Sequence, residues 1–132
     1  MNYIKKLREV KPLVHNITNY VTVNDVANAI LAIGGSPIMS DEITEVAQMT
    51  SISNALNINI GTLNQVKIAS MFEAGKASNA CQHITVLDPV GAGATDLRTN
   101  TCKDLLAQIH FDAIKGNISE IKTLMAGTGH TK

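Results

Sequence analysis

Short apolar runs alternate with segments of helical periodicity along this 132-residue sequence, and no other feature limits the possible folds as strongly. The apolar runs, each of which predicts a strand, are residues 12–17, 36–39, 55–60, 83–87 and 112–114. Between and after them, apolar residues recur three or four positions apart, as on one face of a helix, in stripes that begin at Val23, Ile68, Cys102 and Ile118. Strands and helices that alternate through short connections form parallel sheets. We therefore expect an α/β fold with a parallel central sheet and helices on both faces.

The size and composition of the chain indicate an ordinary globular domain, residues 1–132. Hydrophobic residues make up 45% of the sequence and charged residues 17%. Aromatic residues make up only 3%, too few for the stacking platforms of a nucleic-acid-binding surface. Lys and Arg together number 11, as do Asp and Glu, so no net charge attracts the chain to nucleic acid or to an anionic membrane. We expect neither as a partner.

The sequence shows neither a signal peptide nor a membrane-spanning stretch. No long apolar run follows the charges near the N-terminus, as a signal peptide would require, and no stretch approaches the length of a membrane span. Cys81 and Cys102 do not have the spacing of a metal-binding or redox motif. We expect a cytoplasmic protein with two free thiols, and a frayed end over residues 127–132.

The run 88–94 (DPVGAGA) follows the apolar strand of residues 83–87. Open α/β sheets bind ligands at the carboxyl ends of their strands. Gly91 and Gly93 allow positive φ and close approach of the backbone to an anion, and Asp88 offers a carboxylate oxygen suited to Mg²⁺. This pattern predicts a phosphate cradle with a metal ligand. The alternative is a tight turn between strand and helix, in which Asp88 only caps backbone donors.

A second polar cluster, residues 115–120 (KGNISE), follows the strand of residues 112–114. Lys115 would neutralise a phosphate, unless it is an ordinary solvated lysine. Asn117 and Glu120 have the spacing of a capping box at the start of a helix. That interpretation is compatible with a ligand role, because helix N-termini attract phosphate and a carboxylate there can hold Mg²⁺.

Polar or adaptable residues also follow the first three strands. The segment 14–21 offers side chains that could hydrogen-bond a small polar ligand, although Asn and Thr also favour turns. His15 taken alone favours a structural role over a catalytic one. Met39 would contact a ring or methyl group, or simply fill the core. Gly61 would let the backbone approach a ligand, or belong to a turn in which Thr62 starts the next helix. All these positions fall at the same predicted sheet edge.

Five segments occur together in the order of one known family: residues 15–19 (HNITN), 35–39 (GSPIM), 59–63 (NIGTL), 88–94 and 115–120. As a set they make the chain resemble the hydroxyethylthiazole kinase family, over about residues 11 to 125. The resemblance implies a ribokinase-like fold, of which this chain is the N-terminal part, about half of the family's usual length. It also implies ATP-dependent phosphorylation of the hydroxyl group of 4-methyl-5-(2-hydroxyethyl)thiazole, in thiamine biosynthesis.

The resemblance assigns roles to residues at the strand ends. Substrate contacts are expected from Asn19, Val21, Met39 and Gly61. ATP contacts are expected from Lys115, with Asn117, Gly91 and Gly93 beside it. Asp88 and Glu120 are expected to hold Mg²⁺ against the phosphates. The family forms a homotrimer with active sites between subunits, so residues of one site come from two chains.

The family's catalytic loop, a Gly-Ala-Gly-Cys or Gly-x-Gly-Asp type motif, lies further downstream, and we take the similarity of residues 127–129 to it as coincidence. No catalytic residue is therefore predicted, and we do not expect this chain by itself to catalyse the reaction. One alternative is a non-catalytic truncated paralogue that binds the thiazole or a nucleotide. Another is a different ribokinase-like enzyme such as hydroxymethylpyrimidine kinase, although segments 16–19 and 36–39 favour the thiazole enzyme.

Overall fold

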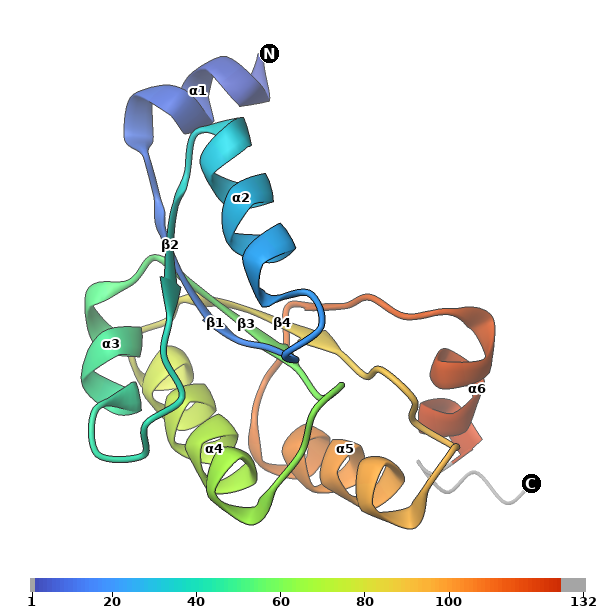
Figure 1. Ribbon diagram of the computed structural model, residues 1–132. Helices are drawn as coiled ribbons and strands as arrows, with labels where there is room; N and C mark the ends of the chain where they lie inside the picture. The colour runs from blue at the N-terminus through green and yellow to red at the C-terminus, as the bar shows by residue number, and fades with distance from the viewer. Residues whose placement is uncertain (1, 127–132) are drawn as a thin grey trace.

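The computed structural model describes residues 2–126; the end predicted to fray, residues 127–132, lies outside the described part. A five-stranded parallel sheet forms the centre of the molecule (Figure 1). Its strands, in the spatial order β2-β1-β3-β4-β5, are β1 (Leu13–Ile17), β2 (Ser36–Met39), β3 (Ala55–Asn59), β4 (Ile84–Asp88) and β5 (Ala113–Ile114). The parallel sheet and each expected strand are confirmed, with bounds that differ by at most one residue at either end.

The helices lie on both faces of the sheet, as expected. They are α1 (Tyr3–Val10), α2 (Val23–Ile33), α3 (Val46–Ile52), α4 (Gln65–Ala80), α5 (Asp96–Gln108) and α6 (Ile118–Ala126). Figure 1 shows α2 on one face and α3, α4 and α5 side by side on the other. Within residues 2–126, no helix combines the length and apolar character needed to cross a membrane.

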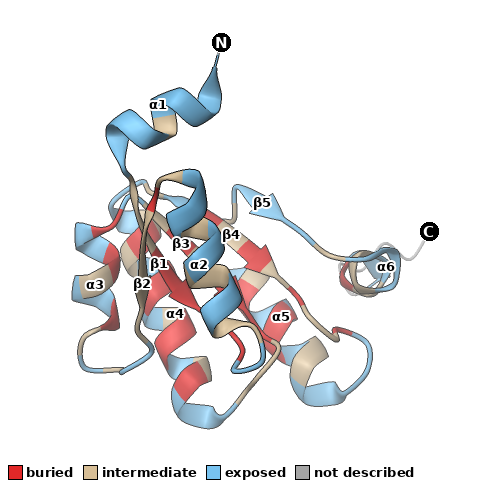
Figure 2. Ribbon diagram, turned by 45° about the horizontal axis from the view of Figure 1, so that its top comes forward, coloured by how far each residue is buried: buried red, intermediate tan, exposed pale blue. Residues whose placement is uncertain are grey.

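The core lies between the sheet and the α4–α5 layer (Figure 2). Leu56 and Ile58 of β3 and Met71 of α4 are fully buried in it. Side chains alternate between the faces of a strand, so the opposite face carries different residues. On that face Asn57 donates a hydrogen bond to Asn16 (3.2 Å), and α2 contributes no fully buried residue. The α2 face therefore contains polar side chains among its apolar ones, and α2 covers it less completely than α4 and α5 cover the other face.

Two helices were not predicted from the sequence. Helix α1 is eight residues long, is capped by the Asn2 side chain and has no buried residue. Helix α3 is only seven residues long, and one of its two buried residues is the polar Thr50. Neither segment has a long apolar stripe in its sequence. Helix α1 is largely exposed, and α3 buries Thr50, a polar residue that apolar periodicity assigns to the surface.

Both cysteines are free thiols, as expected, with Cys81 exposed and Cys102 buried. Burial raises the pKa of the Cys102 thiol to about 11, and the nearby charge of Glu120 acts in the same direction. Cys102 therefore stays protonated at neutral pH and behaves as a small core residue.

Candidate functional site

The carboxylate of Asp88 is the centre of a polar cluster at the carboxyl edge of the sheet. Asp88 and Asn59 are neighbours across β3 and β4, and Asn59 Nδ2 donates to Asp88 Oδ2 at 2.9 Å. Lys115 Nζ lies 3.5 Å from the same oxygen. The Asp88 side chain is 18% exposed, so it is shielded but reachable. Its partners are side chains, not backbone amides, so the alternative of a simple capping Asp does not describe this geometry.

A cavity of about 530 Å³ lies against this cluster. Several predicted site residues line it together: Asn19, Val21, Gly61, Asp88 and Lys115. They come from the segments after β1, β3 and β5 and from the end of β4. The structure therefore brings predicted substrate residues and predicted phosphate residues to one cavity, as the parallel sheet requires.

Asn59 hydrogen-bonds three residues that line this cavity, Asn19, Gly61 and Asp88, although it was not among the predicted site residues. Its Oδ1 accepts hydrogen bonds from Asn19 Nδ2 (3.1 Å) and from the Gly61 amide (2.8 Å), while its Nδ2 reaches Asp88. A Cβ on Gly61 would lie 2.9 Å from both Asn19 Cβ and Asn59 Oδ1, so only glycine fits. The available signal was that β3 carries two asparagines, Asn57 and Asn59, and that Asn59 is the one at its carboxyl end. Helix α4 is capped by Asn64, so Thr62 does not start it.

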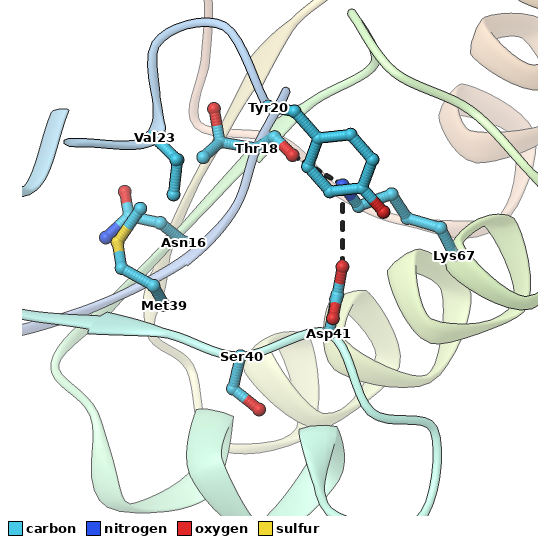
Figure 3. Close-up of a pocket in the computed structure, with 8 residues that line it drawn as sticks. All are labelled: Asn16, Thr18, Tyr20, Val23, Met39, Ser40, Asp41 and Lys67. Carbon is cyan, nitrogen blue, oxygen red and sulfur yellow. Dashed lines mark hydrogen bonds and ion pairs between the residues drawn. The ribbon is translucent and has the colours of Figure 1, made fainter. Parts of the chain in front are cut away.

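Met39 lies elsewhere. It lines a smaller cavity of about 190 Å³ with Asn16, Thr18, Tyr20, Val23, Ser40, Asp41 and Lys67 (Figure 3). Thr18 borders both cavities, while Asn19 and Val21 line only the larger one. Within one chain, the structure does not place Met39 in the same cavity as the other predicted substrate residues.

The glycine turn has the predicted backbone conformation. Gly91 and Gly93 have φ values of +75° and +92°, which favour glycine. Their amides, however, already have acceptors in the protein: Gly91 N donates to Glu120 Oε1 and Gly93 N to Thr99 Oγ1, both at 2.9 Å. The glycines therefore shape the turn, and their amide hydrogens are not directed at the cavity.

Asn117 and Glu120 form the predicted capping box. Asn117 Oδ1 accepts from the Glu120 amide and Glu120 Oε2 accepts from the Asn117 amide, each at 2.9 Å. Both Glu120 oxygens thus bond backbone amides, since Oε1 accepts from Gly91. Neither residue lines the larger cavity.

The fit of the site to Mg²⁺ depends mainly on Asp88. Over residues 2–126 no group of three or more His, Cys, Asp or Glu side chains is placed to hold a metal ion. Mg²⁺, however, keeps several waters and is often bound by one or two carboxylates together with substrate phosphates. Asp88 Oδ1 accepts no hydrogen bond from the described residues, so this oxygen fits such a site.

His15 is structural, as the sequence favoured. It is fully buried, with Nε2 2.8 Å from the Ser40 carbonyl and Nδ1 2.9 Å from Thr50 Oγ1. A carbonyl only accepts, so Nε2 carries the hydrogen and Nδ1 accepts from the Thr50 hydroxyl. Burial lowers the pKa of His15, against smaller opposing effects of the Ser40 hydrogen bond and the Glu45 charge. The ring is therefore neutral and ties β1 to α3.

Arg98 of α5 was also missed, because a basic residue near a helix start resembles any surface cation. Its guanidinium donates to the carbonyls of Val90 (2.7 Å) and Gly61 (2.9 Å). It therefore connects the segment after β3 to the turn after β4, and it packs against the backbone of Gly91.

A parallel sheet that gathers a carboxylate, a lysine and small polar side chains over one cavity defines an open α/β protein with a ligand site at its carboxyl edge. The comparisons with known proteins narrow this class. The chain belongs to the hydroxyethylthiazole kinase family, whose model matches residues 4–132. It is 57% identical over 129 residues to the hydroxyethylthiazole kinase of Clostridium acetobutylicum, covering 98% of this chain and 47% of that protein.

Two further relatives agree. The hydroxyethylthiazole kinase of Methanocella arvoryzae is 49% identical over 129 residues, which cover 98% of this chain and 48% of that protein. The solved structure of the hydroxyethylthiazole kinase from Pyrococcus horikoshii superimposes with a TM-score of 0.91 at 44% identity, covering 96% of this chain and 51% of that one. The expected fold class is confirmed. The chain spans about half the length of the relatives it matches.

Proposed function

We propose that this chain provides the acceptor- and nucleotide-binding surface for ATP-dependent phosphorylation of the hydroxyl group of 4-methyl-5-(2-hydroxyethyl)thiazole, a kinase reaction of thiamine biosynthesis. One observation carries the proposal: Asn19, Val21, Gly61, Asp88 and Lys115 line a single cavity of about 530 Å³. Membership of the hydroxyethylthiazole kinase family supports the choice of acceptor.

The acceptor side of the cavity has the chemistry of a small heterocyclic alcohol. Val21 is 88% exposed and offers an apolar surface to a ring. A carboxamide carries two N–H donors, and Asn19 uses one of them on Asn59. The other donor is available to a ring nitrogen or a hydroxyl oxygen. In this proposal, Gly61 keeps the backbone close to the ligand and Met39 contributes an apolar contact.

The phosphate side needs positive charge and fixed positions, because phosphoryl transfer depends mainly on these two contributions. Lys115, with its side chain 80% exposed, would contact the nucleotide phosphates. Mg²⁺, when bound, would neutralise charge on the phosphate oxygens. Asp88 would be its carboxylate ligand, and Glu120 would be a second one from outside the larger cavity, through lone pairs that its hydrogen bonds from the Gly91 and Asn117 amides do not use. We place Asn117, Gly91 and Gly93 beside the nucleotide, where Asn117 and Gly91 would act through the Glu120 hydrogen bonds.

We also propose a cytoplasmic homotrimer with sites shared between subunits. The separation of Met39 from Asn19 and Val21 is compatible with shared sites, because Met39 of one subunit could then contact a ligand in the larger cavity of another. Residues 1–132 would form one folding unit, the N-terminal part of a ribokinase-like kinase, which is consistent with the cluster of buried apolar residues that extends from Ile17 to Leu124.

Calorimetric titration of the purified chain tests the proposal. The thiazole alcohol, and separately Mg²⁺ with a non-hydrolysable ATP analogue, should each bind. A preference for hydroxymethylpyrimidine over the thiazole alcohol would favour the related pyrimidine kinase, and absence of binding to all of these ligands would contradict the proposal. Phosphorus NMR of a mixture with ATP then separates a catalytic chain, which forms a phosphate ester, from one that only binds.

A further inference from the structure

Lys67 occupies a position that is unfavourable for a lysine in two respects. Its side chain is only 3% exposed, and lysine is almost never fully buried unless it is paired. It also lies in the first turn of α4, where the helix dipole disfavours a positive charge. A cation kept in such a place must have partners that compensate for both effects.

Those partners come from two segments that follow neighbouring strands. Lys67 Nζ donates to the Thr18 carbonyl at 2.6 Å and lies 3.4 Å from Asp41 Oδ2 (Figure 3). The same ammonium lies 4.4 Å from the centre of the Tyr20 ring, within the range of a cation–π interaction. Thr18 and Tyr20 follow β1, whereas Asp41 follows β2. One buried side chain of α4 therefore connects both segments.

The segment after β1 matters because it borders both cavities. Thr18 lines the two of them, and Asn19 and Val21 extend into the larger one. Among residues 2–126, the other side-chain hydrogen bonds of this segment join neutral groups, such as those from the Tyr20 amide to Thr62 Oγ1 at 3.2 Å and from Asn19 Nδ2 to Asn59 Oδ1 at 3.1 Å. The charge-assisted bond from Lys67 is stronger than a neutral one, and it comes from a 16-residue helix that packs in the core.

We propose that Lys67 is a positioning residue that holds residues 18–22 in place and thereby sets the affinity for the acceptor alcohol. This inference rests on the proposed function. Lys67 does not line the larger cavity, where Asp88 and Lys115 lie. Its loss should therefore weaken binding of the alcohol and leave binding of the nucleotide unchanged.

The test compares Lys67→Met with Lys76→Met. Both lysines are on α4, but Lys76 is 54% exposed and, within the described part of the chain, its one ion pair is with the similarly exposed Glu73. In the ligand-free chain, the amides of Tyr20 and Thr22, which donate to Thr62 Oγ1 and Asn19 Oδ1, should exchange with solvent about tenfold faster in Lys67→Met, and not in Lys76→Met. The dissociation constant of the alcohol should rise by a similar factor, with that of the ATP analogue changed less than about twofold.

Unchanged exchange of the Tyr20 and Thr22 amides in a folded Lys67→Met chain would overturn the proposal, as would equal weakening of both ligands. If that variant fails to fold, Asp41→Asn serves instead, because the Asp41 side chain is 48% exposed and the change removes only the charge partner of Lys67. Asp41→Asn should show a smaller increase in the exchange rate of the same amides. An unchanged exchange rate in this variant would overturn the proposal. If the unmodified chain does not bind the alcohol, the proposed function fails together with the effect on affinity, while the exchange rates still decide whether Lys67 holds the segment.

Discussion

The carboxylate of Asp88, at the end of β4, lies 3.5 Å from the ammonium of Lys115, just after β5. The Lys115 side chain is 80% exposed, and ion pairs with such an exposed partner contribute little to stability. Stabilisation of the fold therefore does not account for this ion pair. Its place beside the larger cavity instead makes each charge available to a ligand of opposite charge.

Replacement of Lys115 by Met should weaken binding of the ATP analogue by about tenfold, because one charge-assisted contact to phosphate is lost. The free energy of unfolding should change by less than about 1 kcal/mol. Calorimetry and urea denaturation measure the two quantities. The matched control is Lys122→Met on α6, which is exposed and does not line the cavity. Equal affinities of the two variants would remove Lys115 from the nucleotide site.

Replacement of Asp88 by Asn tests the metal role separately. The new amide oxygen can still accept from Asn59, so the local structure should persist. The charge is lost, so the gain in nucleotide affinity on adding Mg²⁺ should fall by about tenfold or more. Titrations with and without Mg²⁺ measure this gain. Asp104→Asn, on the exposed side of α5, should keep it. A variant at Asp88 that kept the full gain would show that Mg²⁺ binds elsewhere.

Arg98 should be more important for stability than either charged residue at the cavity. Replacement by Met removes the donors to the Val90 and Gly61 carbonyls and should lower the free energy of unfolding by about 1–3 kcal/mol. Arg98→Lys should recover only part of this loss, because an ammonium lacks the fork that spans two carbonyls. Urea denaturation is the measurement, with exposed Lys103→Met of the same helix as control. Full recovery by Lys would contradict the bridging role.

The sequence predicted the features that follow from local rules. Apolar periodicity located the strands, and the parallel arrangement placed Asn19, Gly61, Asp88 and Lys115 at one edge. The spacing of Asn117 and Glu120 predicted a capping box that the structure contains. Each of these depends on residues close together in the chain or on the general geometry of parallel sheets.

Features that depend on long-range packing were not predictable in this way. Lys67 and Arg98 were not identified from the sequence, since nothing local shows that their side chains reach carbonyl groups 49 and 37 positions away. The separation of Met39 from Asn19 was missed for a related reason. Two neighbouring strand ends share an edge, but the path of the intervening segment decides which cavity each side chain enters.

The stability of the chain should depend on pH through His15. Burial lowers its pKa from the ordinary value of 6.5, so the folded chain takes up a proton on this ring less readily than the unfolded chain does. The stabilisation is therefore complete above about pH 6.5 and is lost as the pH falls toward the lowered value. Urea denaturation should give a lower free energy of unfolding at about pH 5.5 than at about pH 7.5.

His15→Gln provides the comparison, because glutamine does not titrate. It should be less stable at about pH 7.5 by about 1–3 kcal/mol, since the bonds to Thr50 and Ser40 are weakened or lost, and should lose less stability on acidification. His110→Gln is the control: that side chain is 79% exposed, so its contact with Asp112 at 3.6 Å contributes little, and the pH dependence of this variant should stay close to the parent's. If His15→Gln lost as much free energy as the parent between the two pH values, other groups would have to explain the acid sensitivity, and the neutral, buried imidazole would not be its source.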